Sequence, residues 1–152
     1  MRILLFGHTY QPSRSEQIRH VLQTLSRTEA ELVAHGDFYD FLSKEFPDVC
    51  HRIGEIDCRG DYTADMALSI GGDGTFLRAA EKIGDRGIPV LGVNIGRLGF
   101  LADVPAEEVE PVLNEILEGK YKIEERSLLQ VEFNGLSENF WQIGRASCRE
   151  RV

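Results

Sequence analysis

The stretch SIGGDGTFLRAA, residues 69–80, places one aspartate, Asp73, among three glycines, between an apolar run and a helix-like pattern. A strand that ends in glycines and continues into a helix is typical of an α/β sheet, where ligands bind beyond the carboxyl ends of the strands. Gly71, Gly72 and Gly74 allow positive φ, and we expect them to let a ligand approach the backbone closely. Amides of such a turn, next to a helix N-terminus, favour phosphate oxygens.

Asp73 itself has two possible roles at this position. A carboxylate repels phosphate, but it can accept a proton from an attacking hydroxyl or hold Mg²⁺, as phosphoryl transfer requires. The alternative is structural, because aspartate is also a common cap at a helix start. The turn has neither the lysine of a Walker loop nor the usual Gly-x-Gly-x-x-Gly order of a Rossmann loop.

Outward from this turn, the sequence alternates strand-like and helix-like segments. Apolar runs predict strands at 3–7, 30–35, 65–70 and 88–94. Amphipathic patterns predict helices that begin near Ser13 or Ser15 and at 37–46, 75–84 and 107–119. Pro111 requires the last helix either to start near Glu110 or to bend. This order predicts an α/β domain with a parallel Rossmann-like sheet and helices on both faces.

The pattern changes after Gly119. Tyr121, Ile123 and later apolar residues alternate as in strands, which predicts the start of a second, all-β domain. We therefore expect an α/β nucleotide-binding domain at 1–120, the first strands of a truncated β domain at 121–142, and a non-native tail at 143–152. The tail IGRASCRERV resembles the translation of a DNA sequencing-library adapter. We expect the 152-residue chain to be a truncated form that lacks the activity of the intact protein.

A second glycine-rich stretch, GVNIGRLGFLADV at 92–104, follows the predicted strand at 88–94. Its loop, with Asn94, Gly96 and Gly99, is expected on the same sheet edge as Asp73, so that the two loops form a cleft. Phe100 could then provide an apolar wall for a base. The alternative is that Phe100 lies in the core.

Composition excludes several classes of function. The net charge of −8 makes a nucleic-acid partner a poor fit, because phosphate backbones require clustered lysine and arginine. No apolar run is long enough to span a membrane, and the N-terminus lacks the pattern of a signal peptide, so we expect a cytoplasmic protein without membrane partners. Cys50 and Cys58 match no zinc pattern and are expected to be free thiols.

The stretches GGDGTFLRAA and NIGRLGFLADV, at this spacing, together resemble the NAD kinase family, and ILEGKYKIEERSLLQV resembles its passage into a second domain. The resemblance covers residues 1–141. It implies an N-terminal α/β domain, a C-terminal β-sandwich domain and homo-oligomers. It also implies transfer of the γ-phosphate of ATP to the adenosine 2′-hydroxyl of NAD, with a divalent metal such as Mg²⁺.

The resemblance also assigns roles to single residues. Asp73 matches the catalytic proton acceptor, Gly74 a backbone contact to NAD, and Arg78 a position that contacts NAD in some members. The positions that line the adenosine pocket are matched by Leu77, Phe100 and Leu101. Gly72 and Asn94, in the two loops, complete the nucleotide-binding candidates, and no residue is assigned as a metal ligand.

Two other functions remain possible. The short motif GGDGT also occurs in lipid kinases of the diacylglycerol type, although the second loop argues against that class. A non-catalytic nucleotide-binding module would bind nucleotide without needing Asp73. The family's Asn-Glu pair, expected shortly after ENFW, is absent, because the chain reads ENFWQIGRAS there.

Overall fold

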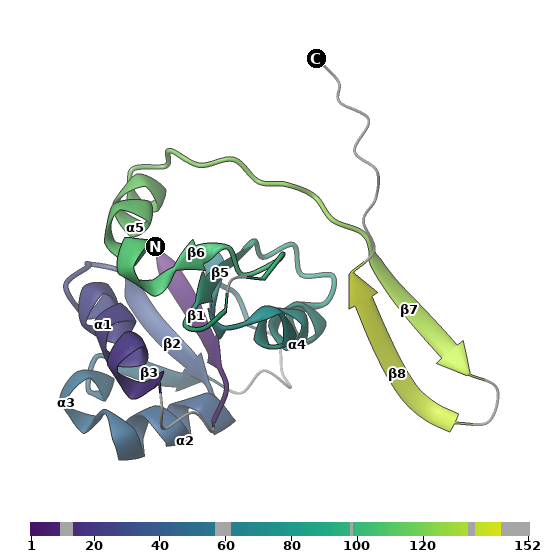
Figure 1. The fold of residues 1–152 in the computed structure, drawn as a ribbon, viewed down its shortest axis with the longest axis horizontal. Coiled ribbons are helices and arrows are strands. Elements are labelled where there is room, and N and C mark those ends of the chain that lie inside the picture. The colour runs from purple at the N-terminus through teal and green to yellow at the C-terminus, as the bar shows by residue number, and fades with distance from the viewer. Residues whose placement is uncertain (10–13, 57–61, 98, 134–135, 144–152) are drawn as a thin grey trace. The chain divides into compact units, whose positions relative to one another are not determined.

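A computed structural model of the chain describes residues 1–9, 14–56, 62–97, 99–133 and 136–143, with side chains described only as far as residue 127. Figure 1 shows the elements in chain order: β1 (Arg2–Gly7), α1 (Ser15–Ser26), β2 (Glu31–His35), α2 (Gly36–Glu45), α3 (Pro47–Cys50), β3 (Ile53–Ile56), β4 (Met66–Gly71), α4 (Asp73–Ile83), β5 (Val90–Asn94), β6 (Val104–Pro105), the 3-10 helix η2 (Ala106–Glu108), α5 (Val109–Leu117), β7 (Leu128–Phe133) and β8 (Leu136–Ile143).

Six strands form one parallel sheet in the order β3-β2-β1-β4-β5-β6. The chain moves outward from β1 to β2 and β3 on one side, and from β4 to β5 and β6 on the other. The boundary between β1 and β4 is therefore the topological switch point, where ligands bind in open α/β sheets. Asp73, two residues after the end of β4, lies at this boundary. The predicted α/β fold with a parallel Rossmann-like sheet is confirmed.

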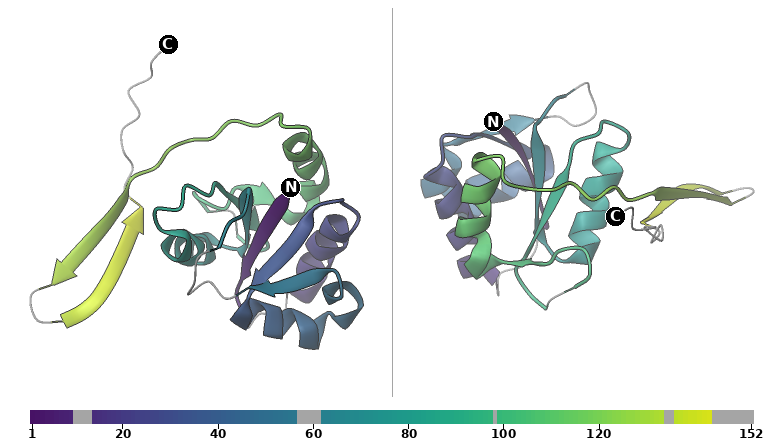
Figure 2. Two further views of the ribbon diagram at one scale, coloured as in Figure 1. Left: turned by 180° about the vertical axis from the view of Figure 1, so that it is seen from behind. Right: turned by 90° about the horizontal axis from the view of Figure 1, so that it is seen from above.

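Both faces of the sheet are buried, because alternate residues of each strand enter different cores. Ile3 and Leu5 of β1 pack in a cluster with α1, α2 and α5, whereas Leu4 and Phe6 pack in a second cluster with α4. Figure 2 shows α4 on one side of the sheet and α1 with α5 on the other. The helices thus hold the carboxyl edge of the sheet as a fixed platform.

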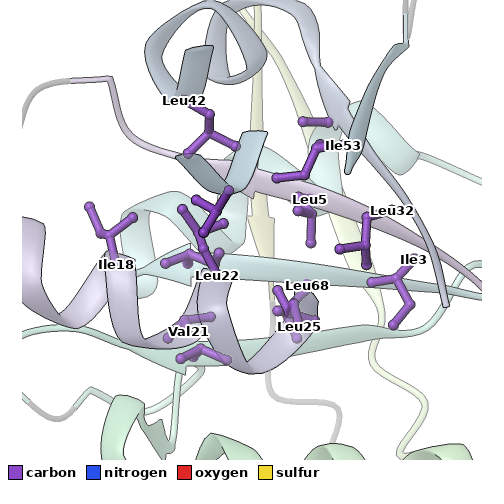
Figure 3. Close-up of a cluster of buried hydrophobic side chains, with 14 of the residues drawn as sticks. Ile3, Leu5, Ile18, Val21, Leu22, Leu25, Leu32, Leu42, Ile53 and Leu68 are labelled. Carbon is purple, nitrogen blue, oxygen red and sulfur yellow. The ribbon is translucent and has the colours of Figure 1, made fainter. Parts of the chain in front are cut away.

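Helix α1 shows why the apolar spacing predicted the packing. Its residues Ile18, Val21, Leu22 and Leu25 recur at the helical period, and all four are buried against the sheet (Figure 3). The helix begins at Ser15, and Arg14 occupies the N-cap position without a side-chain capping bond; Ser13, the other expected start, lies outside the described residues.

Helix α5 settles the question that Pro111 raised. The helix begins at Val109, after η2, so the proline falls in its first turn. Backbone N–H groups of a first turn have no partner within the helix, so proline costs nothing there and no bend is needed.

The polar segment after Pro47 contains two elements that the sequence pattern did not predict. The short helix α3 and the strand β3 both lie there, and β3 pairs with β2 at the edge of the sheet. Cys50, at the end of α3, is a free and buried thiol whose pKa is raised by burial; Cys58 lies outside the described residues.

The chain divides into two compact units, Met1–Tyr121 and Lys122–Val152. In the second unit, β7 and β8 form an antiparallel hairpin in which Leu128 pairs with Ile143. The strand pattern predicted at Tyr121 and Ile123 was wrong, because residues 120–127 have no regular structure and both side chains are exposed. Residues 144–152 of the predicted tail lie outside the described residues, whereas Ile143 ends β8.

Candidate functional site at the carboxyl edge of the sheet

The two glycine-rich stretches meet at the ends of two neighbouring parallel strands. Gly71, the last residue of β4, is the register partner of Asn94, the last residue of β5. One residue further on, the backbone N–H of Ile95 donates to the carbonyl oxygen of Gly71 at 3.2 Å. The expectation that both loops share one edge of the sheet is therefore confirmed.

The glycines after β4 serve different purposes. A Cβ at Gly71 would come within 2.6 Å of the Thr75 Cβ, so glycine is needed there to let the buried Thr75 pack against the strand end. Gly72 and Gly74 have open space where a side chain would stand. None of these three glycines uses its freedom to adopt positive φ: within the described chain only Gly84, Gly87 and Gly119 adopt it. Open space at Gly72 and Gly74 still allows a ligand to approach the backbone.

The carboxylate of Asp73 holds the second loop. Its Oδ2 accepts a hydrogen bond from the backbone N–H of Phe100 at 2.9 Å, and its Oδ1 accepts from Leu101 at 3.0 Å and Ala102 at 3.1 Å. A Cβ at Gly99 would come within 2.5 Å of the Asp73 Cγ, so only glycine permits this approach. Asp73 makes no side-chain capping bond to its own helix, α4, and the capping role considered for it is wrong.

These contacts set the protonation state of Asp73. The amides of Phe100 and Ala102, and more weakly that of Leu101, stabilise the charged carboxylate and hold the pKa of Asp73 below its ordinary value, against a smaller opposing effect of burial. The side chain is therefore ionised at neutral pH. A carboxylate offers about four acceptor positions, so three amide bonds leave about one for a ligand.

Asn94 organises the same loop from its other end. Its side-chain amide donates to the carbonyl oxygens of Arg97 at 2.8 Å and Ala102 at 3.1 Å, and its Oδ1 accepts from the N–H of Gly96 at 2.6 Å. The residue is buried. The described residues of the loop at 95–102 are thus held by the side chains of Asn94 and Asp73, which leaves Asn94 few free groups with which to contact a nucleotide.

The remaining candidates, on α4 and in the second loop, differ in their exposure to solvent. Phe100 is 87% exposed, so the interpretation of it as a core residue is wrong. Leu101 is half-buried beside it. Leu77 is half-buried one turn along α4 from Asp73, and Arg78 is exposed on the same helix. A large apolar ring exposed beside a fixed carboxylate is suited to covering a flat ligand.

Sequence reasoning missed Arg14. Its Nη1 donates to the carbonyl oxygen of Ile95, and a Cβ at Gly96 would come within 2.5 Å of the guanidinium carbon. The second loop is therefore contacted from the start of α1 as well as from α4. Its position in the sequence could have indicated it, because Arg14 directly precedes α1 in the connection that follows β1 at the switch point.

No ready-made metal centre accompanies these residues. Among the described side chains, no three His, Cys, Asp or Glu residues gather closely enough to hold a metal ion. Within the same ranges, no helix combines the length and apolar character that crossing a bilayer would require.

Comparison with known proteins relates this geometry to a family. The family profile described as ATP-NAD kinase N-terminal domain matches residues 3–121. The NAD kinase of Bacteroides fragilis is 41% identical over 131 residues, which are 86% of this chain and 45% of that protein. The NAD kinase of Porphyromonas gingivalis is 38% identical over 143 residues, 91% of this chain and 48% of that protein. The chain thus spans about half the length of these relatives.

A solved structure supports the fold. The crystal structure of yeast NADH kinase in complex with NADH superposes with a TM-score of 0.73 at 22% identity, over 94% of this chain and 46% of that one. At this level of identity the likeness concerns the arrangement of the elements.

Proposed function

The chain belongs to the ATP-NAD kinase family, and from that membership we propose that the protein transfers the γ-phosphate of ATP to the 2′-hydroxyl of the adenosine ribose of NAD, forming NADP. The observation that carries the proposal is the Asp73 carboxylate, which joins the two glycine-rich loops beside the switch point. Membership in this family favours NAD kinase over a lipid kinase with the same short motif.

In the proposed reaction, the 2′-oxygen bonds to the γ-phosphorus, the bond from that phosphorus to the β,γ-bridging oxygen breaks, and ADP leaves. The proton of the 2′-hydroxyl passes to Asp73. A carboxylate with a lowered pKa is a weak base. That suffices in a loose transition state, because the hydroxyl needs little activation before the phosphoryl group is nearly free. Asp73 therefore acts mainly by orienting the hydroxyl and accepting its proton late.

The other candidate residues bind and exclude water. Open space at Gly72 and Gly74 lets the ribose and phosphates approach the backbone. The exposed ring of Phe100, with Leu101 and Leu77, would cover the adenine, and Arg78 would contact NAD from α4. Positioning and electrostatic stabilisation then supply most of the rate.

Charge on the donor phosphates would be neutralised by a divalent ion such as Mg²⁺. Because the described side chains offer no cluster of three ligands, phosphate and water oxygens would hold that ion, as is usual for Mg²⁺. We place the protein in the cytoplasm, with small nucleotides as its partners and a homo-oligomer as its assembly.

The test is an assay of the longest reading frame that contains this chain. The purified protein is incubated with ATP, Mg²⁺ and NAD, and NADP is measured with an NADP-specific dehydrogenase; diacylglycerol replaces NAD in a parallel sample. We expect NADP and no phosphorylated lipid. Binding of both nucleotides without formation of NADP would instead support a non-catalytic module.

A further inference from the structure

The turn after β4 lacks the cation that a phosphate donor requires. Residues 71–74 contain no basic side chain and one carboxylate. Phosphoryl transfer uses cationic groups to hold the donor and to offset charge that develops on it. Arg78 is the next basic residue along the chain, and it is exposed on α4. Other basic side chains of the same sheet edge belong to other segments, among them Arg14 before α1 and Arg97 after β5.

Arg14 is in a position to supply that charge. Its guanidinium is hydrogen-bonded to the carbonyl oxygen of Ile95, and the N–H of Ile95 is bonded to Gly71. A single residue, Ile95, thus connects the guanidinium to Gly71 at the start of the glycine turn. Arg14 directly precedes α1, on the β1 side of the switch point, while Asp73 follows β4 on the other side. The guanidinium of Arg14 itself contacts Ile95, just after β5, so the side chain brings its charge from the β1 side of the switch point to the carboxyl edge of the sheet.

The charge of Arg14 is not neutralised within the described part of the chain. There, Arg2, Arg19 and Arg126 each have a carboxylate partner, whereas the contact of Arg14 is to a neutral carbonyl oxygen. A guanidinium carries five N–H donors in a fork that matches phosphate oxygens. One bond to Ile95 fixes the position of the group and leaves donors for an anion. Partial burial would strengthen that contact by reducing solvent screening.

We propose that Arg14 binds the polyphosphate chain of the phosphate donor and is the cation that the glycine turn lacks. The identity of the donor as ATP rests on the proposed function; the binding of a polyphosphate chain rests on Arg14 alone. The rival explanation is that Arg14 only anchors the second loop through Ile95.

Two substitutions separate the explanations. Arg14→Gln retains an amide that can donate to the Ile95 carbonyl but removes the charge, and Arg14→Lys retains the charge. Arg19→Gln is the matched control, because it makes the same chemical change within α1, close to Arg14 in the sequence, at a residue paired with Asp48. The variants are made in the longest reading frame, and the dissociation constants of inorganic tripolyphosphate, ATP and NAD are measured by calorimetry.

We expect Arg14→Gln to weaken tripolyphosphate and ATP binding by about tenfold or more, the effect of losing one hydrogen bond between charged groups. Arg14→Lys should retain most of the affinity, and Arg19→Gln should behave as the parent protein. NAD binding and melting temperature should change little in all three. Parent-like tripolyphosphate binding by Arg14→Gln would overturn the proposal, and so would equal losses for NAD and tripolyphosphate, which indicate an anchor only.

A second measurement applies to the unsubstituted protein. Tripolyphosphate should protect Arg14, but not Arg19, from modification by phenylglyoxal, as followed by mass spectrometry of the peptides. Absence of protection at Arg14 would overturn the proposal even if Arg14→Gln fails to fold. Protection at Arg14 in a protein that forms no NADP would support the polyphosphate site and refute the proposed kinase activity.

Discussion

The turn after β4 and the loop after β5 leave neighbouring strands at one sheet edge, but they are held by different kinds of contact. The turn continues at once into α4, and the N–H groups of Thr75 and Phe76 bond back to Gly72 at 3.0 and 3.1 Å. The loop at 95–102 is held through three side chains: Arg14 just before α1, Asn94 at the end of β5 and Asp73 at the start of α4. The turn is encoded locally, whereas the loop depends on the rest of the domain.

This difference gives Asp73 two roles. Its ionised carboxylate is the proposed proton acceptor, and the same oxygens order the loop that carries Phe100. Substituting Asp73 should therefore change chemistry and loop order together. The predictions below test whether the two regions respond separately.

The largest effect is expected for Asp73→Asn. In the longest reading frame, we expect its turnover of NAD to fall by about 10²-fold or more, as for loss of a general base. The new amide nitrogen would also face one of the N–H donors of the loop, so that bond is lost. Hydrogen exchange should speed up at Phe100, Leu101 and Ala102 and stay slow at Thr75 and Phe76.

Asp103→Asn is the control for that experiment, because Asp103 is an exposed carboxylate directly after the loop. It should leave both turnover and hydrogen exchange unchanged. Near-normal turnover in Asp73→Asn together with faster exchange in the loop would make Asp73 a structural residue only.

A smaller effect is expected for Gly99→Ala, which tests how closely the loop must approach Asp73. The new methyl group would overlap the carboxylate, so loop and aspartate must separate. We expect destabilisation of about 1–3 kcal/mol, typical of overpacking, measured by chemical denaturation. Gly72→Ala, where the methyl group meets open space, should cost little by the same measurement. Equal stabilities for the two variants would contradict a tight contact between Asp73 and the loop.

Phe100→Ala should separate binding from folding. Because the ring is 87% exposed, its removal should change the free energy of unfolding by no more than about 0.5 kcal/mol. A ring that covers adenine contributes binding energy, so we expect NAD affinity to fall about tenfold, as for loss of an aromatic stack of about 1–3 kcal/mol. Calorimetry with NAD and thermal melting give both quantities. A large drop in melting temperature with unchanged NAD affinity would refute this role.

The sequence was informative where structure is local. Apolar runs identified β1, β2, β4 and β5 because these strands are buried on both faces, and helical spacing identified the buried face of α1. The edge strand β3 was missed because two of its four residues, Gly54 and Glu55, are exposed, so it has no apolar run. At Tyr121 and Ile123 the apolar alternation is present but the predicted strand is not, because alternation without a partner strand does not form a sheet.

The site was predictable in position but not in detail. The rule that ligands bind at the carboxyl ends of parallel strands brought Asp73 and Asn94 to one edge. The three amides that bind Asp73 could not be predicted, because a backbone N–H leaves no mark on the sequence. The contact of Arg14 with Ile95 joins residues 81 positions apart, and nothing in the local pattern of either one points to the other.

The smallest expected effect is the one that tests the local turn by itself. Gly74 is exposed in the first turn of α4, its φ is not positive, and a side chain there would meet open space. Gly74→Ala should therefore raise the free energy of unfolding by about 0.4–1 kcal/mol, since alanine reduces the freedom of the unfolded chain without native strain. If NAD approaches the backbone at Gly74, the same methyl group should weaken NAD binding, so the variant becomes more stable and less active. A more stable variant with unchanged affinity for NAD would mean that the open space at Gly74 is not used by the ligand, and that the close approach occurs on the side of the second loop.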